Sequence, residues 1–546
     1  MRFVLLLYVG VCTTTFGQER TLSTEQQNKV DQLFSRWNTT NSPGMAVGIV
    51  SNGEMLYSKG YGLSNIEHKV ANTPSTAFNI ASNSKQFTAA AILILHLKKK
   101  LDINQSVKEI FPEFPHYFQQ ITIKHLLHHT SGIRDYSQLT YLSGLRPNDY
   151  YNNEDILRWI TQQQALNFEP GDAFLYSNSN YWLLGQIVQK IAGASLATFA
   201  EKEIFKPLKM QHTRFIDNNS MLIQNRASGY SSSRQGGFRN RITRLEHIGS
   251  SGVYTTVNDL KKWIDAYHKN TFLPTGFWTL MSTKGRLNNG KEIAYACALE
   301  IQAYRGLPTI EHGGRAPGYV SDIIRFPKEK FAVIVLTNIG NSNATQLGYQ
   351  IASIFLKDKF NNRSSVKQNI VNNGFIDTKS LSAYTGAYWN AKDAYSRKIV
   401  LENDTLLYAR NSRNRNKLLP VSKHTFKMMN TPPGADVFVR FSEKNRMIFN
   451  ENGLEVAFFS KYIPAAYTNE TFEKYTGTFY SQELATHYEF KKVKNSLQLF
   501  INGQRSVFLA PVMNAVFNSP MALFKFHVVE GKAINVTIST PRVKNV

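Results

Sequence analysis

Cysteine is almost absent from this chain, which contains two in 546 residues, Cys12 and Cys297. Cys12 lies in an N-terminal segment that we expect to be removed, and the one thiol left cannot close an internal disulfide. Acidic residues are also few, since 39 Asp and Glu stand against 63 Lys and Arg, for a net charge of +24. Disulfides are therefore excluded as a source of stability, and folding must rest on side-chain packing.

The apolar run at the N-terminus is short. Residues 3–12 amount to about half of the roughly 20 apolar residues that a membrane-spanning helix needs. A charged residue precedes the run and the small Gly17 follows it, which is typical of a cleaved secretory signal. We predict a signal peptide over residues 1–17 and an exported protein, periplasmic or secreted, with no transmembrane anchor after cleavage. A lipid anchor at Cys12 is disfavoured because Val11 is bulky where such signals carry Gly or Ala.

The excess of basic residues would elsewhere indicate a nucleic-acid partner. An exported protein rarely meets nucleic acid, and the basic residues are dispersed, with short clusters at 98–100 and 410–417. We therefore expect no nucleic-acid partner and an attraction to an acidic envelope or peptidoglycan surface. The sequence does not indicate the oligomeric state.

The order of predicted elements indicates an α+β domain over residues 18–358, built from an antiparallel sheet with helices. Asn52-Gly53 is a tight-turn pair between two apolar strands, and the Ala-, Leu- and Ile-rich residues 81–97 predict a buried helix. Strands followed by helices and again by strands are the pattern of a layered domain. The other predicted elements are a helix over 24–38 and strands at 45–50, 54–58, 309–312, 319–326 and 331–338, the last three broken by Gly313-Gly314, Pro317-Gly318 and Pro327.

Beyond a polar linker at 359–379, the chain repeats itself with an offset of 91 residues. Residues 381–388 recur at 472–479, and the pair Pro420 and Phe426 recurs as Pro511 and Phe517. Each copy alternates apolar and polar residues, which is typical of half-buried strands. We predict two small antiparallel, barrel-like β modules, module 1 over 380–466 and module 2 over 467–546.

Ser82 and Lys85 are the first candidate catalytic pair. The spacing of three places both side chains on one face of the predicted helix. A serine is a poor nucleophile at neutral pH, and a lysine whose charge is disfavoured by burial can accept its proton. Ser364 and Lys367 have the same spacing, but they lie in the polar linker, where no rigid scaffold holds them.

Residues 78–91, FNIASNSKQFTAAA, resemble the nucleophile segment of the class C β-lactamase-like, penicillin-binding-protein-like serine hydrolases. Residues 121–133 and 249–260 also resemble segments of this family, so the likeness covers roughly residues 25–355. It implies a β-lactamase/transpeptidase-like domain with Ser82 as nucleophile and Lys85 as its activating partner. The resemblance implies no metal and no organic cofactor.

Two further elements of the family are present. Tyr176-Ser177-Asn178 resembles its Tyr-x-Asn loop, which implies Tyr176 as a general base or acid and Asn178 as a hydrogen-bonding partner of Lys85 or the substrate amide. A tyrosine beside a cationic lysine can have its pKa lowered. Either Tyr176 or Lys85 could be the primary base. A turn is the alternative interpretation of this segment, because Ser and Asn favour turns.

The third element is His312-Gly313-Gly314, which we expect at the end of a strand, where the family carries Lys-Thr-Gly or His-x-Gly. By resemblance, the N–H groups of Ser82 and Arg315 would form the oxyanion hole, and the glycines would let the strand approach the scissile carbonyl. An imidazole without a neighbouring hydroxyl is expected to bind a substrate carboxylate weakly.

These motifs predict an exported serine hydrolase that cleaves an ester or amide bond, of the D-amino-acid peptide type, in a small peptide or ester. The tandem β modules resemble the layout of D-aminopeptidases. A D-alanyl-D-alanine carboxypeptidase or a weak β-lactamase is the alternative, since Arg315 or Arg134 could compensate for the missing Lys-Thr pair. A non-catalytic wall-binding or sensor homologue is a further alternative.

Overall fold

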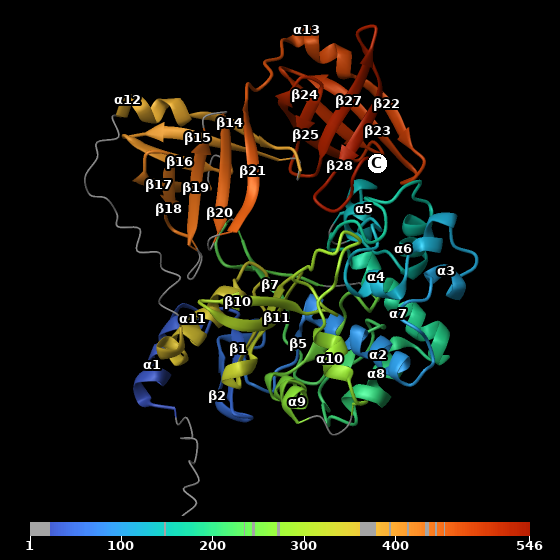
Figure 1. Cartoon of the computed structure of the whole chain (residues 1–546), viewed down its shortest axis with the longest axis vertical. Helices are drawn as coiled ribbons and strands as arrows, with labels where there is room; N and C mark the ends of the chain where they lie inside the picture. Colours follow the sequence, from blue (N-terminus) through green and yellow to red (C-terminus); the bar gives the residue numbers. More distant parts are fainter. Residues whose placement is uncertain are drawn as a thin grey trace, which may run out of the picture.

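The computed structural model describes residues 22–546 except 147–148, 234, 243–245, 270–272, 361–377, 393–394, 412–413, 432–435, 443–444 and 452–453. The predicted signal peptide 1–17, with Cys12, lies outside the described residues, as does most of the predicted linker 359–379. An α+β domain is followed by a closed β-barrel and then by a seven-stranded antiparallel sheet, which confirms the predicted fold class (Figure 1). Within the described residues, no helix is both long and apolar enough to cross a membrane.

A six-stranded antiparallel sheet forms the centre of the first domain, in the order β10-β11-β12-β13-β1-β2. Asn52 and Gly53 have φ angles of 52° and 84°, which confirms the predicted hairpin between its first two strands. The strands are β1 (Met45–Ser51), β2 (Glu54–Tyr61), β10 (Glu300–Tyr304), β11 (Leu307–Ala316), β12 (Tyr319–Phe326) and β13 (Phe331–Thr337).

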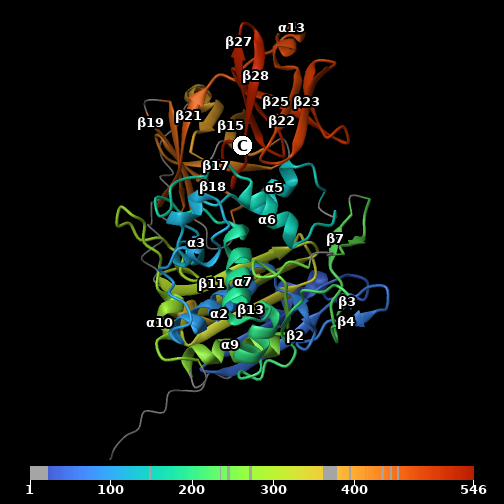
Figure 2. The same cartoon turned by 90° about the vertical axis from the view of Figure 1, so that its right-hand side faces the viewer.

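Helices cover both faces of this sheet, so that β1, β12 and β13 are buried throughout. On one face, α1 (Thr24–Phe34) packs against α11 (Ala344–Phe355) over a separate apolar core. The sequence predicts a helix over residues 24–38. The α-helix ends at Phe34, four residues before the predicted end, and the chain continues as a short 3₁₀ helix, η1 (Ser35–Trp37). The other face carries the helical layer that holds the candidate site (Figure 2).

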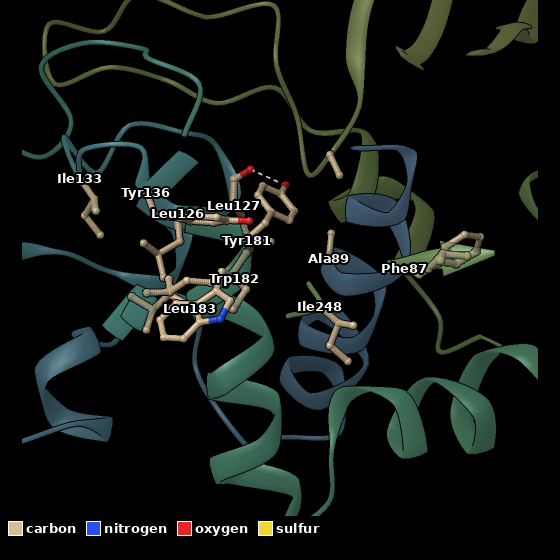
Figure 3. Close-up of a cluster of buried hydrophobic side chains, with 14 of the residues drawn as sticks. Phe87, Ala89, Leu126, Leu127, Ile133, Tyr136, Tyr181, Trp182, Leu183 and Ile248 are labelled. Atoms are coloured by element: carbon tan, nitrogen blue, oxygen red, sulfur yellow. Dashed lines mark hydrogen bonds between the residues drawn. The ribbon is translucent and has the colours of Figure 1, made fainter. Parts of the chain in front are cut away.

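Two buried helices dominate that layer, α2 (Lys85–Leu97) and α7 (Asn178–Ala192). Figure 3 shows Ala89 of α2 between that helix and Tyr181 of α7, whereas Phe87 projects from the other side of α2, where it packs against Phe205 and Trp263. The Tyr181 hydroxyl donates a 2.8 Å hydrogen bond to the carbonyl of Leu127. Because both helices are fixed by close packing, their first residues, Lys85 and Asn178, are held at a constant separation.

Short elements connect these layers and cover the helices. The helices are η2 (Ala81–Ser84), α3 (Val107–Ile110), η3 (His116–Gln120), α4 (Ile123–Leu127), α5 (Tyr136–Leu142), α6 (Asn153–Thr161), α8 (Leu196–Ala200), the π-helical η4 (Glu201–Phe205), α9 (Val257–His268), α10 (Phe277–Ser282), η5 (Pro327–Glu329) and η6 (Lys357–Lys359). The strands are β3 (Leu63–Asn65), β4 (Val70–Ala71), β5 (Phe78–Asn79), β6 (Arg214–Phe215), β7 (Tyr230–Ser232), β8 (Phe238–Asn240) and β9 (Val253–Thr255).

The two C-terminal modules repeat the same hairpins, as the 91-residue offset predicts. In module 1, Pro420 pairs with Phe426, and in module 2 Pro511 pairs with Phe517, each beside a register shift. Module 1 closes into a barrel because its last strand pairs with its first. Its elements are α12 (Thr378–Leu381), η8 (Ser382–Tyr384), β14 (Gly386–Asn390), β15 (Tyr395–Glu402), β16 (Thr405–Ala409), β17 (Arg415–Ser422), β18 (Thr425–Met428), β19 (Val437–Ser442), β20 (Arg446–Glu451) and β21 (Leu454–Tyr462).

Module 2 packs directly on the first domain, above α5 and α6 in Figure 2. Its apolar interior belongs to the same core cluster as the helical layer, whereas module 1 has a core of its own. The Tyr488 hydroxyl donates a 2.8 Å hydrogen bond to the carbonyl of Leu142 at the end of α5. Module 2 contains α13 (Asn469–Phe472), η9 (Glu473–Tyr475), β22 (Gly477–Ser481), β23 (Thr486–Val493), β24 (Ser496–Ile501), β25 (Arg505–Met513), β26 (Val516–Asn518), β27 (Leu523–Val529) and β28 (Lys532–Ser539).

Candidate active site

The three predicted motifs meet at one cavity of about 1110 Å³ between the sheet and the helical layer. Ser82 from η2, Tyr176 and Asn178 from the start of α7, and residues 312–315 of β11 all line it. Lys85 lies behind Ser82 and is fully buried. The structure therefore brings every predicted site residue together, although these residues are separated by more than 200 positions in the sequence.

Ser82 lies in a 3₁₀ turn and Lys85 is the first residue of the α-helix that follows. Side chains three residues apart are eclipsed in a 3₁₀ helix, which places the Lys85 Nζ 3.1 Å from the Ser82 Oγ. The preceding Ala81 has a φ of 49°, a left-handed conformation that costs a non-glycine residue about 1 to 2 kcal/mol. The Asn79 side chain holds this conformation by accepting a 2.8 Å hydrogen bond from the Ala81 N–H.

Burial lowers the pKa of Lys85 well below its ordinary value; Asp135 opposes this shift and Arg542 adds to it. The Lys85 amine therefore favours its neutral form, which has two N–H donors and one lone pair. Two acceptors that cannot donate lie beside it, the Asn178 Oδ1 at 2.9 Å and the Ser250 carbonyl at 2.7 Å. In the ammonium form Nζ also donates to the Ser82 Oγ, whereas in the neutral amine these two acceptors take both N–H groups and the lone pair faces Ser82.

Asp135, which sequence reasoning missed, fixes the orientation of Asn178. Its buried carboxylate accepts 3.1 Å hydrogen bonds from the Asn178 backbone N–H and from the Asn178 Nδ2. A carboxylate can only accept, so the Asn178 amide must turn its oxygen toward Lys85. Asp135 also accepts from the Ser137 N–H at 2.8 Å as the N-cap of α5, so it caps the first turns of two helices.

Tyr176 lies next to this pair, and its ring centroid is 4.9 Å from the Lys85 Nζ. Burial raises the pKa of Tyr176, although hydrogen bonding to Ser82 and the charge of Arg542 act in the opposite direction. The expected lowering of this pKa is therefore wrong. The expected lowering required a charged Lys85 ammonium beside a Tyr176 phenolate. Burial disfavours both charged forms. The geometry suits Tyr176 as a protonated donor and Lys85 as the base.

The expectation that β11 ends at His312 is also wrong. The strand continues to Ala316, with Gly313 opposite Asp322 and Gly314 opposite Ser321. The glycines do not break the strand, because an extended glycine keeps its ladder hydrogen bonds. A Cβ on Gly314 would lie 2.2 Å from the Ile80 carbonyl oxygen and 3.1 Å from the Ser82 N, whereas a Cβ on Gly313 would lie 3.6 Å from its nearest neighbour. Gly314 therefore allows β11 to pass directly beside the backbone of Ser82.

His312 has both ring nitrogens occupied. Its Nδ1 lies 2.6 Å from the Gly313 carbonyl oxygen, which can only accept, and its Nε2 lies 3.0 Å from the Tyr295 hydroxyl. Burial lowers the pKa of His312 to about 3, so the imidazole is neutral. Nδ1 is then the donor and Nε2 the acceptor, which leaves no N–H for a substrate carboxylate. The Gly313 carbonyl fixes this tautomer, and Tyr295, whose hydroxyl then donates to Nε2, has no motif of its own and was not predicted.

The two arginines that were expected to compensate for the missing Lys-Thr pair have different surroundings. Arg315 lines the cavity, with its guanidinium donating to the carbonyls of Gly340 and Ser342. Arg134 is buried outside the cavity lining, where it contacts Glu483 of module 2. Arg134 therefore fastens module 2 to the first domain and does not face the substrate space.

Arg542 of module 2 also lines the cavity, which the sequence did not indicate. Its guanidinium carbon lies 4.7 Å from the Tyr176 ring centroid, and its Nη1 lies 3.2 Å from the Asp135 Oδ2. Asp135 lies two positions after the family-like residues 121–133, which is the local signal for it, whereas no local pattern marks Arg542. The C-terminal module thus contributes a side chain to the candidate active site.

Comparison with known proteins gives consistent results. A family model described as beta-lactamase matches residues 30–354. The chain is 27% identical over 299 residues to a D-aminopeptidase of Gluconobacter oxydans, covering 54% of this chain and 56% of that protein. It is 28% identical over 421 residues to penicillin-binding protein 4* of Bacillus subtilis, covering 73% and 92%. The fold resembles an octameric penicillin-binding protein homologue from Pyrococcus abyssi, with a TM-score of 0.56 and 21% identity over 80% of this chain and 99% of that chain.

Proposed function

Because this chain belongs to the beta-lactamase family, we propose that it is a serine hydrolase that transfers the acyl group of an ester or amide to Ser82 and then to water. The observation that carries this proposal is the position of the Lys85 amine. Its Nζ lies 3.1 Å from the Ser82 Oγ, and when the amine is neutral Asn178 and Ser250 take its two N–H groups, so that the lone pair faces Ser82. A lysine held in this way is a base ready to activate a serine.

Acylation would begin with transfer of the Ser82 proton to the Lys85 amine, which becomes an ammonium. The Ser82 Oγ then forms a bond to the substrate carbonyl carbon, and the carbonyl oxygen takes the negative charge. The backbone N–H groups of Ser82 and Arg315 are the proposed donors to this oxyanion. As the bond to the leaving group breaks, the protonated Tyr176 hydroxyl donates its proton to that group and is reprotonated by Lys85.

Deacylation would use the same groups. A water molecule gives a proton to the neutral Lys85 amine while its oxygen bonds to the acyl carbon. The bond from that carbon to the Ser82 Oγ breaks, and the proton returns from Lys85 to the serine. Both half-reactions therefore need Lys85 neutral at the start, which its burial favours.

For the substrate, we propose an ester or an amide of the D-amino-acid peptide type. His312 offers no N–H to a carboxylate in the place where the family carries Lys-Thr-Gly, which supports this class. A match named as a D-aminopeptidase supports it further. A D-alanyl-D-alanine carboxypeptidase or weak β-lactamase is the second candidate, which Arg315 and Arg542 in the cavity lining favour. A wall-binding homologue without activity is the remaining alternative.

The site of action is proposed to be outside the cytoplasm, periplasmic or secreted, because residues 1–17 have the pattern of a cleaved signal. There the net charge of +24 would favour contact with an acidic envelope or peptidoglycan surface. Expression of the full chain followed by N-terminal sequencing tests this. A mature protein that begins at Gln18 is expected, and recovery of the intact N-terminus inside the cell would contradict it.

The hydrolase proposal is tested with a panel of p-nitrophenyl esters, D- and L-amino-acid p-nitroanilides and nitrocefin. Wild type is expected to release product from at least one ester or D-amino-acid anilide, and Ser82→Ala is expected to release none above background. Retained binding to purified peptidoglycan, with no turnover of any member of the panel, would favour the non-catalytic alternative instead.

A further inference from the structure

Module 2 places a turn against the catalytic residues of the first domain. After β28, Thr540 and Val543 pair through a 2.7 Å hydrogen bond, with Pro541 and Arg542 between them. The Thr540 Oγ1 accepts from the N–H groups of Arg542 at 3.2 Å and Val543 at 3.1 Å, and proline presets its own φ for a turn. Arg542 therefore projects from a short, braced turn and not from a loose tail.

The first domain binds this turn from several sides. The Arg542 carbonyl accepts a 3.0 Å hydrogen bond from the Asn167 side chain, whose Oδ1 accepts from the Lys544 N–H at 2.8 Å. The buried Arg134 donates to the carbonyls of Lys544 at 2.8 Å and Asn545 at 3.1 Å. Because these bonds fix the backbone, the position of the Arg542 side chain is set by the contact between the two domains.

The guanidinium of Arg542 is only partly occupied. Its side chain is 38% exposed, and within the described residues Asp135 is its sole hydrogen-bonding partner, reached through Nη1. The remaining N–H groups lie where Arg542 lines the cavity, beside Tyr176 and close to the nucleophile. An arginine fork with free donors in a partly desolvated cleft is suited to bind a carboxylate.

The rest of the cavity lining is also cationic. Arg226, Lys291 and Arg315 line it, and none of the three forms an ion pair with another residue in the described ranges. The acidic lining residues compensate this charge poorly. Glu292 lies 3.1 Å from Lys284, which is outside the lining, and burial raises the pKa of Glu300. The cavity therefore favours an anionic ligand.

We propose that Arg542 is a specificity-determining residue, supplied to the active site by module 2, that binds a carboxylate of the substrate. This inference rests on the hydrolase function proposed above and narrows its substrate class. Arg542 would supply the carboxylate contact that Lys-Thr makes in the family and that His312 cannot make. The carboxylate can belong to the acyl half or to the leaving group, and the experiment separates these two sources.

The test measures kcat/KM of the full-length mature protein on two matched substrate pairs. N-acetyl-D-alanyl-D-alanine and its C-terminal carboxamide differ by a carboxylate on the leaving group. p-Nitrophenyl hydrogen adipate and p-nitrophenyl hexanoate differ by a carboxylate on the acyl half. Wild type is expected to prefer the carboxylate-bearing member of one pair, and that pair identifies the half that Arg542 contacts.

Arg542→Gln is expected to reduce this preference by about 10- to 100-fold, since a hydrogen bond to a charged group is lost. Arg542→Lys keeps the charge without the fork and should retain part of the preference. The matched control is Lys525→Gln, which removes one exposed positive charge from β27 of the same module, outside the cavity lining. It should leave the preference as in wild type.

The inference would be overturned if Arg542→Gln lowered kcat/KM equally on both members of each pair, or if it left the preference for the carboxylate-bearing member unchanged. Labelling of Ser82 by a fluorophosphonate separates this failure from failure of the proposed function. If wild type is labelled but shows no preference for carboxylate-bearing substrates, the hydrolase proposal stands and the proposed role of Arg542 is wrong. If wild type is not labelled, the hydrolase proposal itself is wrong. Thermal unfolding of each variant shows that the compared proteins are folded.

Discussion

The carboxylate of Asp135 accepts hydrogen bonds from both the backbone N–H and the side-chain amide of Asn178, each at 3.1 Å. This contact decides which end of the Asn178 amide faces Lys85, and with it the direction of the Lys85 lone pair. The same carboxylate binds Arg542 of module 2. One buried acidic residue thus connects the proposed base to the C-terminal module.

Asp135→Asn is expected to slow fluorophosphonate labelling of Ser82 by about tenfold or more, a part of the roughly 10²- to 10⁴-fold that a general base contributes, because Asp135 acts on Lys85 through Asn178. An asparagine can donate as well as accept, so the Asn178 amide would be free to turn its NH₂ toward Lys85. Loss of a charged cap should also destabilise the fold by about 1 kcal/mol.

The matched control for that variant is Asp259→Asn. Asp259 is equally buried and accepts from the Thr213 hydroxyl and the His212 N–H, but it does not line the cavity. It should lower the melting temperature and leave the labelling rate of the folded protein unchanged. Similar labelling rates in the two variants would show that Asp135 has only a structural role.

The pH dependence of the reaction should report the proton on Lys85. Because the base acts when neutral and burial lowers its pKa, kcat/KM on p-nitrophenyl hexanoate should rise with pH, with a midpoint well below the ordinary lysine value of about 10.4. Arg542→Gln removes a nearby positive charge and should move this midpoint to higher pH. A midpoint at or above about 10.4 would contradict a neutral Lys85.

Gly314 and Gly313 form a matched pair for testing the approach of β11 to the nucleophile. A methyl group on Gly314 would collide with the Ile80 carbonyl at 2.2 Å, whereas one on Gly313 has 3.6 Å of space. Gly314→Ala is expected to reduce kcat/KM by about 100-fold or more, as when an oxyanion donor is lost. Gly313→Ala should retain most of the activity, and equal losses would refute the proposed role of Gly314.

Glu311 and Asp322 lie buried on the α11 side of β11 and β12, and Glu311 should make stability depend on pH. Burial raises the pKa of Glu311 to about 7, while the hydrogen bond from Tyr349 opposes this shift. An acid whose folded pKa is raised contributes stability that is complete below its unfolded pKa of about 4.3 and is lost as the pH rises through about 7.

In wild type the free energy of unfolding should therefore fall by on the order of 3 kcal/mol between pH 5 and pH 8. Glu311→Gln should abolish this fall, as measured by denaturant unfolding. Glu489→Gln is the control, because Glu489 lies partly exposed beside Lys491. If both variants keep the pH dependence of wild type, Glu311 is not its source.

The sequence indicated the position of Ser82 because its motif begins a buried element. Ser82 precedes the apolar residues of α2, so the local pattern placed it at the start of a buried helix, whereas the sequence indicated a loop or turn at Asn178, which begins α7. The 91-residue repeat likewise predicted two similar antiparallel modules, and Pro420 and Pro511 occupy matching places in them, each beside a register shift. At Ser82 and in the two modules, the pattern of neighbouring residues is sufficient to predict the local structure.

The sequence failed where the outcome depends on what surrounds a residue. The Tyr176 pKa is raised because packing encloses the ring, which motif spacing cannot report. Gly313 and Gly314 continue a strand because β12 pairs with them, although a glycine pair usually indicates a turn. Arg542 reaches the cavity only because Arg134 and Asn167 bind its turn, a contact between segments more than 370 residues apart in the chain.

The most direct test of this account is intact-protein mass spectrometry after exposure to a fluorophosphonate, comparing wild type with Ser82→Ala. A single phosphonyl adduct is expected on wild type, located on Ser82 by peptide mapping, and no adduct is expected on the variant. Parallel exposure to a penicillin shows whether the same serine also accepts a β-lactam. No adduct on wild type, or an adduct that persists in Ser82→Ala, would contradict the assignment of Ser82 as an activated nucleophile.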